Sequence, residues 1–547
     1  MAFERSHSTS ASGMSALPER AALLCLALWI GFAVVAAGLY SPAFTGPFIS
    51  DDFGYIVSHP YTETLDAESL REMFDPFGPA KLYTASYAPV HLLLTAVERQ
   101  LFGNQTLGYH LVNVGLHALA GVLLVVWLWQ LGVGRVVATA AGLLFIVHPA
   151  NVEAVAWASQ LKTLTAMIFS LAALLCLRRS PSIATLLFLL ALLSKSAALF
   201  ALPTAAAVAW VLGGREGRKI AAWLCMWLLF GVAYAFPQIA SFAYLPAVDV
   251  EAFDVPGVQL FTIASIGMRY VVMYATAFGV SAWQEPLPVL SPLDPWALGG
   301  AAVACLLLWR LVISLRARST EAVFWVAAIA AFLPVSQIIP FATPMADRYL
   351  YFMLPGLIGG TVLLCRALRQ HPRFDAHMVP VMAALGFALI FGFSLLTAGR
   401  APLWQSESEL LLDAALHYPK GSTASFMRAR RAAQDGEAAE AVAELRLAAN
   451  RGIGHFMALA RDPGLAPLHD EPAFRELLDE LAGRWIARAK QRGDSSQPEL
   501  RLLGLAHMQR AEYREAVAAF EAALELAGPL DEVLQAELQA ARTSFGG

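Results

Sequence analysis

Two adjacent carboxylates, Asp51 and Asp52, follow the first hydrophobic segment and are the strongest pointer to chemistry in the chain. Charged side chains are costly to place beside hydrocarbon, so a pair at a membrane exit indicates contact with water or use in a reaction. Such a carboxylate can act as a general base on a hydroxyl, or bind a divalent metal. Adjacent side chains point in different directions, so one can face a cavity while the other caps a turn or binds a metal. Phe53 and Tyr55 favour Asp52 slightly as the base, because they suit the wall of a site.

Further polar side chains stand at the ends of other hydrophobic segments. These candidate binding residues are His148, Glu153, Lys162, Lys195, Asp347, Arg348 and Tyr349. Lysine and arginine suit a phosphate group, and the planar guanidinium can bind it with two parallel hydrogen bonds. His148 and Glu153 are candidates to orient a base or a sugar.

Each of these residues also has a structural interpretation. His148 precedes a proline and could end a helix at the interface, and Lys195 could snorkel from the end of a span. Arg348 could form an ion pair with Asp347 alone. Trp157, Trp283 and Trp404 fit an interfacial aromatic belt.

The composition is that of a membrane protein. The chain is 58% hydrophobic and 15% charged, with a mean hydropathy of +0.56. Its net charge of −4 argues against nucleic acid as a partner. The five cysteines lie in or beside apolar segments without a C-x-x-C spacing, so neither a disulfide framework nor a zinc site is expected.

Apolar segments and basic loops predict the topology. Roughly eleven segments are apolar enough to cross a bilayer. Basic residues gather in four short loops, which the positive-inside rule places in the cytoplasm: Arg178–Arg179, Arg215–Lys219, Arg310–Arg318 and Arg366–Arg373. Residues 1–20 are then cytoplasmic, 21–399 form the transmembrane domain with a first outer loop at 41–107, and 400–547 are extracytoplasmic. All the candidate residues above then face one side.

The apolar stretch Phe261–Gly279 breaks this scheme, because Arg269 lies at its centre and a span here would invert the next basic loop. It is expected to be a re-entrant or interfacial helix on the outer face. The alternative is a true span with a snorkelling arginine.

The C-terminal part, residues 400–547, changes to alanine, glutamate and arginine at helical spacing. The segment from Leu502 to Ala523 matches the tetratricopeptide template, with small residues at helix crossings and aromatic residues on the packing face. Ala424–Asn450 is a weaker copy. Two or three repeats are few for an independent solenoid, so docking onto the membrane domain or another chain is expected.

Several ordered motifs carry a family resemblance. They are Tyr109–Asn113 with His117–Ala118, His148–Trp157, Leu192–Lys195 and Ala346–Tyr351. In this order, and with the C-terminal repeats, the chain resembles bacterial relatives of the tetratricopeptide-repeat-containing transmembrane O-mannosyltransferases, which have the GT-C fold.

The resemblance implies an enzyme of the bacterial inner membrane that transfers a sugar from a polyprenyl-phosphate donor to a protein or glycan hydroxyl on the periplasmic side. It assigns Asp51 or Asp52 as base, with a divalent metal (Mg or Mn) possible at one of them. Asn151, Thr163 and Ser196 depart from the family pattern, where His, Asp and Glu are common. An inactive membrane-anchored scaffold is therefore the main alternative. A transporter is disfavoured, because the sequence has no P-loop and no obvious internal membrane repeat.

Overall fold

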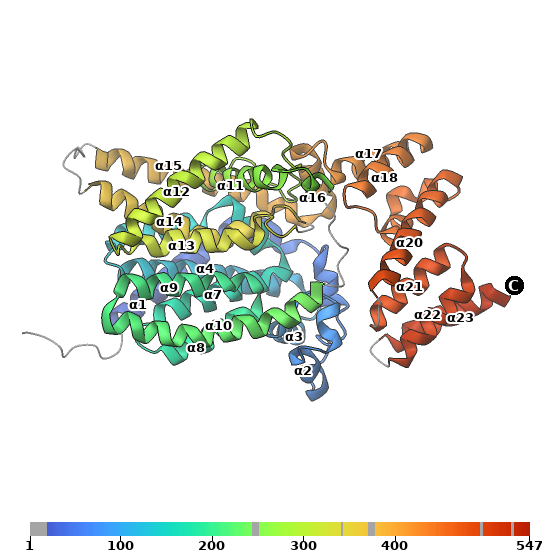
Figure 1. Ribbon diagram of the computed structural model, residues 1–547, viewed down its shortest axis with the longest axis horizontal. Coiled ribbons are helices and arrows are strands. Elements are labelled where there is room, and N and C mark those ends of the chain that lie inside the picture. The colour runs from blue at the N-terminus through green and yellow to red at the C-terminus, as the bar shows by residue number, and fades with distance from the viewer. Residues whose placement is uncertain are drawn as a thin grey trace, which may run out of the picture.

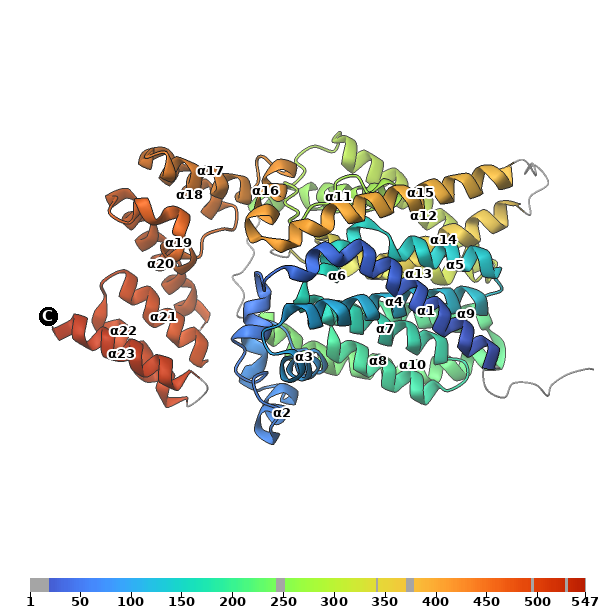
Figure 2. The ribbon, with the colours of Figure 1, turned by 180° about the vertical axis from the view of Figure 1, so that it is seen from behind.

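The computed structural model describes residues 19–242, 251–340, 343–369, 378–492, 496–526 and 530–546. The chain is mostly α-helical, with long helices running side by side in a bundle and a smaller group of helices beyond one end (Figures 1 and 2). The predicted mostly-α polytopic membrane fold is confirmed.

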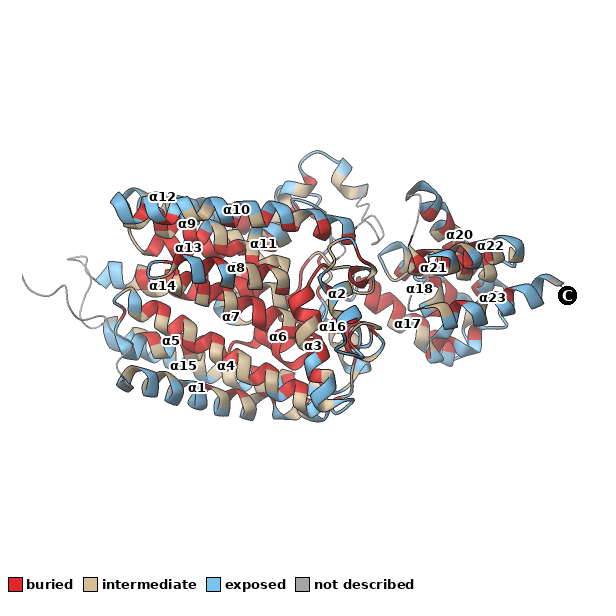
Figure 3. Ribbon diagram, turned by 90° about the horizontal axis from the view of Figure 1, so that it is seen from below, coloured by how far each residue is buried: buried red, intermediate tan, exposed pale blue. Residues whose placement is uncertain are grey.

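Eight helices in the described residues are long and apolar enough to cross a membrane. They are α1 (Glu19–Tyr40), α4 (Thr106–Gln130), α7 (Leu161–Cys176), α10 (Gly214–Phe242), α11 (Val258–Thr276), α12 (Pro295–Arg316), α14 (Asp347–Arg369) and α15 (Met378–Arg400). Helices α4, α7 and α14 are the most buried, whereas α1, α12 and α15 expose most of their apolar surface (Figure 3). Exposed apolar helices at the rim of a buried core are what a lipid environment requires.

The other membrane-domain helices are shorter. They are α2 (Ala67–Phe74), α3 (Pro89–Phe102), α5 (Arg135–Ile146), α6 (Val152–Ala156), α8 (Pro181–Ser194), α9 (Ala201–Leu212) and α13 (Glu321–Phe332). The chain bends by 51° between α5 and the segment containing α6. Helices α8, α9 and α13 belong to apolar stretches of 10–17 residues, so with the bent pair there is room for the expected set of spans.

Helix α11 enters and leaves the bundle on the same side. Near its start, Gln259 donates hydrogen bonds to the carbonyls of Gln337 and Ile338, in the loop before α14. Near its end the Tyr274 hydroxyl reaches Thr361, well inside α14, yet the Ser281 amide is back at Asp347, the first residue of α14. These contacts favour the re-entrant interpretation of this stretch over a complete span.

Helix α14 packs on α13 with almost no gap. A Cβ added at Gly356 would lie 2.5 Å from the backbone nitrogen of Ala328. Glycine is required there because the two backbones approach too closely for any side chain.

The predicted cytoplasmic loops, apart from residues 370–373, which lie outside the described residues, gather at the end of the bundle that faces away from the C-terminal helices (Figure 1). Arg178 pairs with Glu216 at 2.8 Å, and Arg366 donates to the carbonyl of Gly132 at 2.8 Å. The guanidinium of Arg318 lies 5.3 Å from the ring centre of Trp210. The prediction that these loops share one side therefore agrees with the fold, while the orientation in the membrane stays a prediction.

The C-terminal helices have hydrophobic clusters of their own, separate from that of the membrane bundle. They are α16 (Glu407–His417), α17 (Ser422–Gln434), α18 (Ala438–Asn450), α19 (Phe456–Arg461), α20 (Pro472–Arg492), α21 (Gln497–Gln509), α22 (Tyr513–Glu525) and α23 (Asp531–Gly546). Helices α17 and α18, and α21 and α22, form successive packed pairs. Their assignment as tetratricopeptide repeats stays a prediction, as do the domain limits.

The C-terminal helices are fastened to the bundle by buried polar contacts. Asp413 on α16 pairs with Arg400 at 2.9 Å and accepts the Ala282 amide at 2.8 Å. Glu285 accepts hydrogen bonds from the Thr423 hydroxyl at 2.9 Å and from the Thr423 amide at the start of α17. A carboxylate at a helix N-terminus is stabilised by the exposed amides and the helix dipole, so Glu285 acts as a clamp on α17.

Candidate active site

Asp51 and Asp52 lie in the turn that follows α1 and precedes a single turn of π-helix, Phe53–Val57. Ser50 adopts a left-handed conformation with φ of 50°, which makes the turn sharp. Asp52 is 1% exposed, and its two oxygens accept the backbone amides of Ile49 at 3.1 Å and Ser159 at 2.8 Å. Asp51 is exposed. The two carboxylates therefore diverge, as expected for neighbours in the chain.

The environment of Asp52 is that of a structural clamp. Burial raises the pKa of its carboxyl to about 6, although both backbone hydrogen bonds favour the charged form. Each oxygen already has a donor, and the Ser159 amide belongs to the segment between α6 and α7. Asp51 is the more accessible of the two carboxylates, and which of them acts as the base stays a prediction.

Arg348 and Glu153 form a buried ion pair between α14 and α6. A guanidinium nitrogen of Arg348 contacts one oxygen of Glu153, and the Arg348 backbone amide donates to the other oxygen at 2.7 Å. Glu153 is 3% exposed. The interpretation that Arg348 pairs only with Asp347 is wrong, because its guanidinium pairs with Glu153, 195 positions away in sequence.

Aromatic rings support the face of the Arg348 guanidinium. It lies 5.5 Å from the ring centre of Trp157 and 5.1 Å from that of Tyr349. The Trp157 indole donates to the carbonyl of Ile49 at 3.3 Å, which links Arg348 to the segment that carries Asp51. At these distances the guanidinium makes cation–π contacts with both rings, which help to fix its position.

Two of the three tryptophans assigned to an interfacial belt are core residues instead. Trp157 and Trp404 are buried, with ring centres 5.4 Å apart, whereas Trp283 is 43% exposed. Their packing joins α6 to the segment after α15, a long-range contact that the sequence alone does not reveal.

Lys162 and Lys195 lie close to this group and have neutral partners. The Lys162 ammonium is 3.8 Å from the ring centre of Tyr55, in the first outer loop. The Lys195 ammonium donates to the Thr163 hydroxyl at 2.7 Å. Among the described residues, neither lysine has a carboxylate within ion-pair distance.

The electrostatics of Lys195 show which charges share its surroundings. Burial lowers its pKa well below the usual value, and the positive charges of Lys162 and Arg348 lower it further. The charges of Glu153 and Asp51 oppose that shift. Charges of four sequence-predicted residues, two of them positive and two negative, therefore act on Lys195 at this end of the bundle.

Two predicted binding residues make several hydrogen bonds within the protein. The ring of His148 is fully buried, with Nδ1 accepting the Ala150 amide at 3.2 Å and Nε2 lying 3.1 Å from the carbonyl of Tyr274. It caps the bend between α5 and α6, as its structural interpretation proposed. Asp347 accepts the Ser281 amide at 3.0 Å and the Gln284 side-chain amide at 2.6 Å, so it holds the loop after α11.

The sequence indicated Tyr55 as part of a site wall and Thr163 as a departure from the family pattern, but not that these two residues contact Lys162 and Lys195. Two further members of this region, His59 and His91, were missed. The ring of His91 lies beside Tyr55 and that of His59 beside Tyr83, both histidines are buried, and burial lowers the pKa of His59 to about 4. Single histidines among aromatic residues gave no pattern from which these contacts could be identified.

The residues present do not form a resident metal site. In the described parts of the chain, no group of three or more His, Cys, Asp or Glu side chains could hold a metal ion. Asp52 already accepts two amide hydrogens, and Asp51 would be a single ligand. The expected Mg²⁺ or Mn²⁺ has no ready-made set of protein ligands here.

The chain is similar to one curated protein over part of its length. It is 32% identical over 181 residues to a protein O-mannosyl-transferase of Caenorhabditis elegans, covering 30% of this chain. The chain spans about a quarter of the length of that relative, since the match covers 25% of it. No family model and no solved structure matches. The comparisons therefore indicate a distant glycosyltransferase relative.

Proposed function

We propose that this protein is a GT-C-type glycosyltransferase that moves a sugar from a polyprenyl-phosphate donor to an acceptor hydroxyl, outside the cytoplasm. The observation that carries the proposal is the position of the exposed carboxylate Asp51, on a loop that Trp157 links to Arg348 and whose Tyr55 ring lies against Lys162. Lys195 joins this group through its hydrogen bond to Thr163, the neighbour of Lys162 in the chain. A base and a cluster of cations are what this transfer needs. The partial similarity to an O-mannosyl-transferase supports the same reaction class.

In the proposed reaction, Asp51 accepts the proton of the acceptor hydroxyl as the hydroxyl oxygen attacks the anomeric carbon. The bond from that carbon to the donor phosphate oxygen breaks, and the lipid phosphate leaves with the electron pair. Arg348 and Lys195 stabilise the leaving phosphate. Asp52 keeps the first outer loop against the segment between α6 and α7, which positions Asp51.

The threonine at position 163, where the family commonly has aspartate, has a physical consequence for Lys195 in this scheme. An aspartate there would sit beside Lys195 and neutralise it within the protein. The Thr163 hydroxyl accepts one hydrogen bond without removing the positive charge. The remaining charge of Lys195 is then available to a phosphate group.

A transfer assay with the full-length protein tests the proposal. A labelled sugar on a polyprenyl-phosphate carrier is supplied in a membrane mimic, and transfer to peptide or glycan hydroxyls and release to water are both measured. The proposal expects turnover that depends on Asp51. Binding of the donor without any turnover, over a panel of sugars, would favour the inactive scaffold suggested by Asn151, Thr163 and Ser196.

The orientation is tested separately. We propose that the candidate site and the C-terminal helices are periplasmic, in the inner membrane of a bacterium. Reporter fusions at Arg215 and Leu412 should report opposite sides of the membrane. The same side for both would contradict this topology.

We further propose that the C-terminal helices recruit the acceptor. Removal of residues 496–547 leaves the Glu285 clamp on α17 in place. This truncation should retain sugar release to water and lose transfer to the native acceptor. Unchanged acceptor glycosylation would assign these helices another role.

A further inference from the structure

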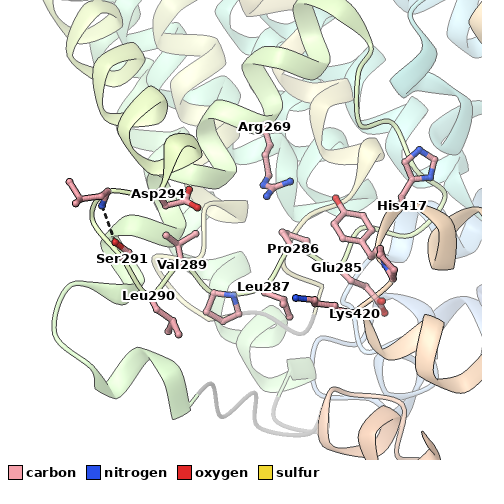
Figure 4. A pocket seen from close by; sticks show the side chains of 15 residues that line it. Arg269, Glu285, Pro286, Leu287, Val289, Leu290, Ser291, Asp294, His417 and Lys420 are labelled. Atoms are coloured by element: carbon pink, nitrogen blue, oxygen red, sulfur yellow. Dashed lines mark hydrogen bonds between the residues drawn. The ribbon is translucent and has the colours of Figure 1, made fainter.

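A pocket of about 690 Å³ lies away from the candidate active site, where the loop after α11 meets the start of the C-terminal helices. Its walls are the segment 285–294 on one side and the turn 417–421 on the other, with Arg269 of α11 between them. In Figure 4, Arg269 points into the space between these walls and Lys420 approaches from the side of the C-terminal helices.

The pocket is lined by two cations, Arg269 and Lys420, and by two carboxylates, Glu285 and Asp294. The guanidinium of Arg269 lies 4.6 Å from the ring centre of Trp296, and its Nε is buried without a hydrogen-bond partner among the described residues. Lys420 is exposed. A buried donor without a partner is unfavourable, so an acceptor that fills the pocket would be stabilised there.

The two carboxylates in the pocket wall are already engaged. Glu285 accepts the hydroxyl and amide of Thr423 and the hydroxyl of Ser422. Asp294 caps α12 by accepting the amides of Trp296 at 2.9 Å and Ala297 at 3.0 Å. Their charges are therefore directed at helix N-termini, whereas the positive charges are directed at the pocket.

The rim of the pocket is apolar and exposed. Leu287, Leu290 and Leu293 are 53%, 70% and 76% exposed and lie on one wall. Helix α11 and helix α12, which flank this wall, are both long and apolar enough to cross a membrane. The two cations Arg269 and Lys420, beside exposed leucines, suit a ligand with an anionic head group and hydrocarbon chains.

We propose that this pocket binds the phosphate head group of an anionic phospholipid, with Arg269 and Lys420 contacting the phosphate and the three leucines contacting the acyl chains. The ligand is distinct from the sugar donor, and the pocket does not include Asp51, Lys195 or Arg348. Because the pocket lies between the loop held by Asp347 and the clamp at Glu285, a bound lipid would brace the C-terminal helices against the membrane domain.

The test uses the full-length protein in detergent without sugar donor. Binding of dioctanoyl phosphatidylglycerol is titrated by native mass spectrometry, with dioctanoyl phosphatidylcholine and inorganic phosphate in parallel. Arg269→Gln and Lys420→Gln should each weaken phosphatidylglycerol binding about tenfold, since each removes a charge-assisted contact. Arg318→Gln is the matched control, because Arg318 also stacks on a tryptophan but lies at the other end of the bundle.

Each outcome bears on the proposal. Arg269-dependent binding of phosphatidylglycerol, unchanged in Arg318→Gln and much weaker for phosphatidylcholine, supports it. Equal affinity in all variants overturns it, and inorganic phosphate binding as tightly as the lipid overturns the lipid assignment. Lys420 is exposed, so loss of binding in Lys420→Gln cannot be attributed to misfolding. Activity is not measured, so the result is independent of the proposed transferase.

Discussion

Each end of the helical bundle contains an arginine–glutamate ion pair with a buried carboxylate, and the two pairs differ in how fully the arginine is hydrogen-bonded. At the end with the basic loops, Arg310 forms two hydrogen bonds with Glu321, at 2.7 and 2.6 Å, and Trp325 adds a third to the same carboxylate. At the other end, Arg348 contacts Glu153 through one guanidinium nitrogen and stacks on aromatic rings. One arrangement satisfies its charges within the protein. The other keeps part of its positive charge available to a ligand.

The largest expected effect separates the two aspartates. Asp51→Asn should lower turnover about 10²–10⁴-fold, because it removes the proposed general base, and should leave thermal stability unchanged. Asp52→Asn should instead lower stability, because an amide group cannot accept both the Ile49 and Ser159 amide hydrogens. Turnover assays and thermal unfolding of both purified variants check this. Near wild-type turnover in Asp51→Asn would remove the central residue of the proposed function.

Arginine substitutions test the comparison between the two ends. Arg348→Gln should weaken donor binding about ten- to a hundredfold, the effect of losing a charge-assisted phosphate contact. Arg310→Gln should leave donor binding unchanged but lower stability by about 3 kcal/mol, since it leaves Glu321, 2% exposed, without its counter-charge. Donor affinity and unfolding temperature are measured for each.

Arg348→Gln also leaves Glu153 buried and unpaired, which could lower stability for a reason unrelated to the donor. The double variant Glu153→Gln/Arg348→Gln removes that unpaired charge. It should recover stability without recovering donor affinity. If Arg348→Gln and Arg310→Gln both lose donor affinity, or both lose only stability, the proposed difference between the two ends is wrong.

Lys195 predicts a pH dependence of donor affinity. The ammonium form binds phosphate, and burial with the neighbouring cations lowers its pKa well below the usual value. Affinity should therefore fall as pH rises, and at a lower pH than an ordinary lysine would allow. Lys195→Arg should keep the affinity and lose this dependence, because arginine stays charged. Equilibrium donor binding across pH checks it, and an identical pH profile in both proteins would contradict it.

The smallest expected effect is a pH dependence of stability from Asp52. Its pKa is raised from 3.8 to about 6, so its favourable contribution is complete below the unfolded value and is lost as pH rises through the folded value. Unfolding temperature should fall between about pH 4 and pH 7 by this contribution. Asp52→Asn should flatten that slope. If the unfolding temperature of the wild type and of Asp52→Asn falls with pH at the same slope, another group is responsible for the pH dependence.

The fold was largely predictable because hydrophobic length and charge act locally along the chain. Apolar segments identified the membrane helices, and the basic loops that were placed on one side do lie at one end of the bundle. The arginine at the centre of 261–279 indicated a re-entrant helix, which the contacts of Gln259 and Ser281 support.

The site was predictable only in part. Residue types and their sides indicated that Asp51, Lys162, Lys195 and Arg348 would lie near one another. Their partners depend on helix packing: Glu153 and Arg348 are 195 positions apart, and Trp157 meets Ile49 across 108 positions. His148 and Asp347 have the same polar character as the other candidates. Only the fold reveals that their hydrogen-bonding atoms are directed at backbone amides, carbonyls and a glutamine.

The glycine contact between α13 and α14 has a mechanical consequence. With Gly356 against the backbone of Ala328, neither helix can slide or rotate on the other without a collision. Arg348 lies at the start of α14, so its position is fixed by this helix pair and does not shift toward an incoming substrate. A bulky lipid-linked substrate must then reach Arg348 through displacement of elements other than this helix pair.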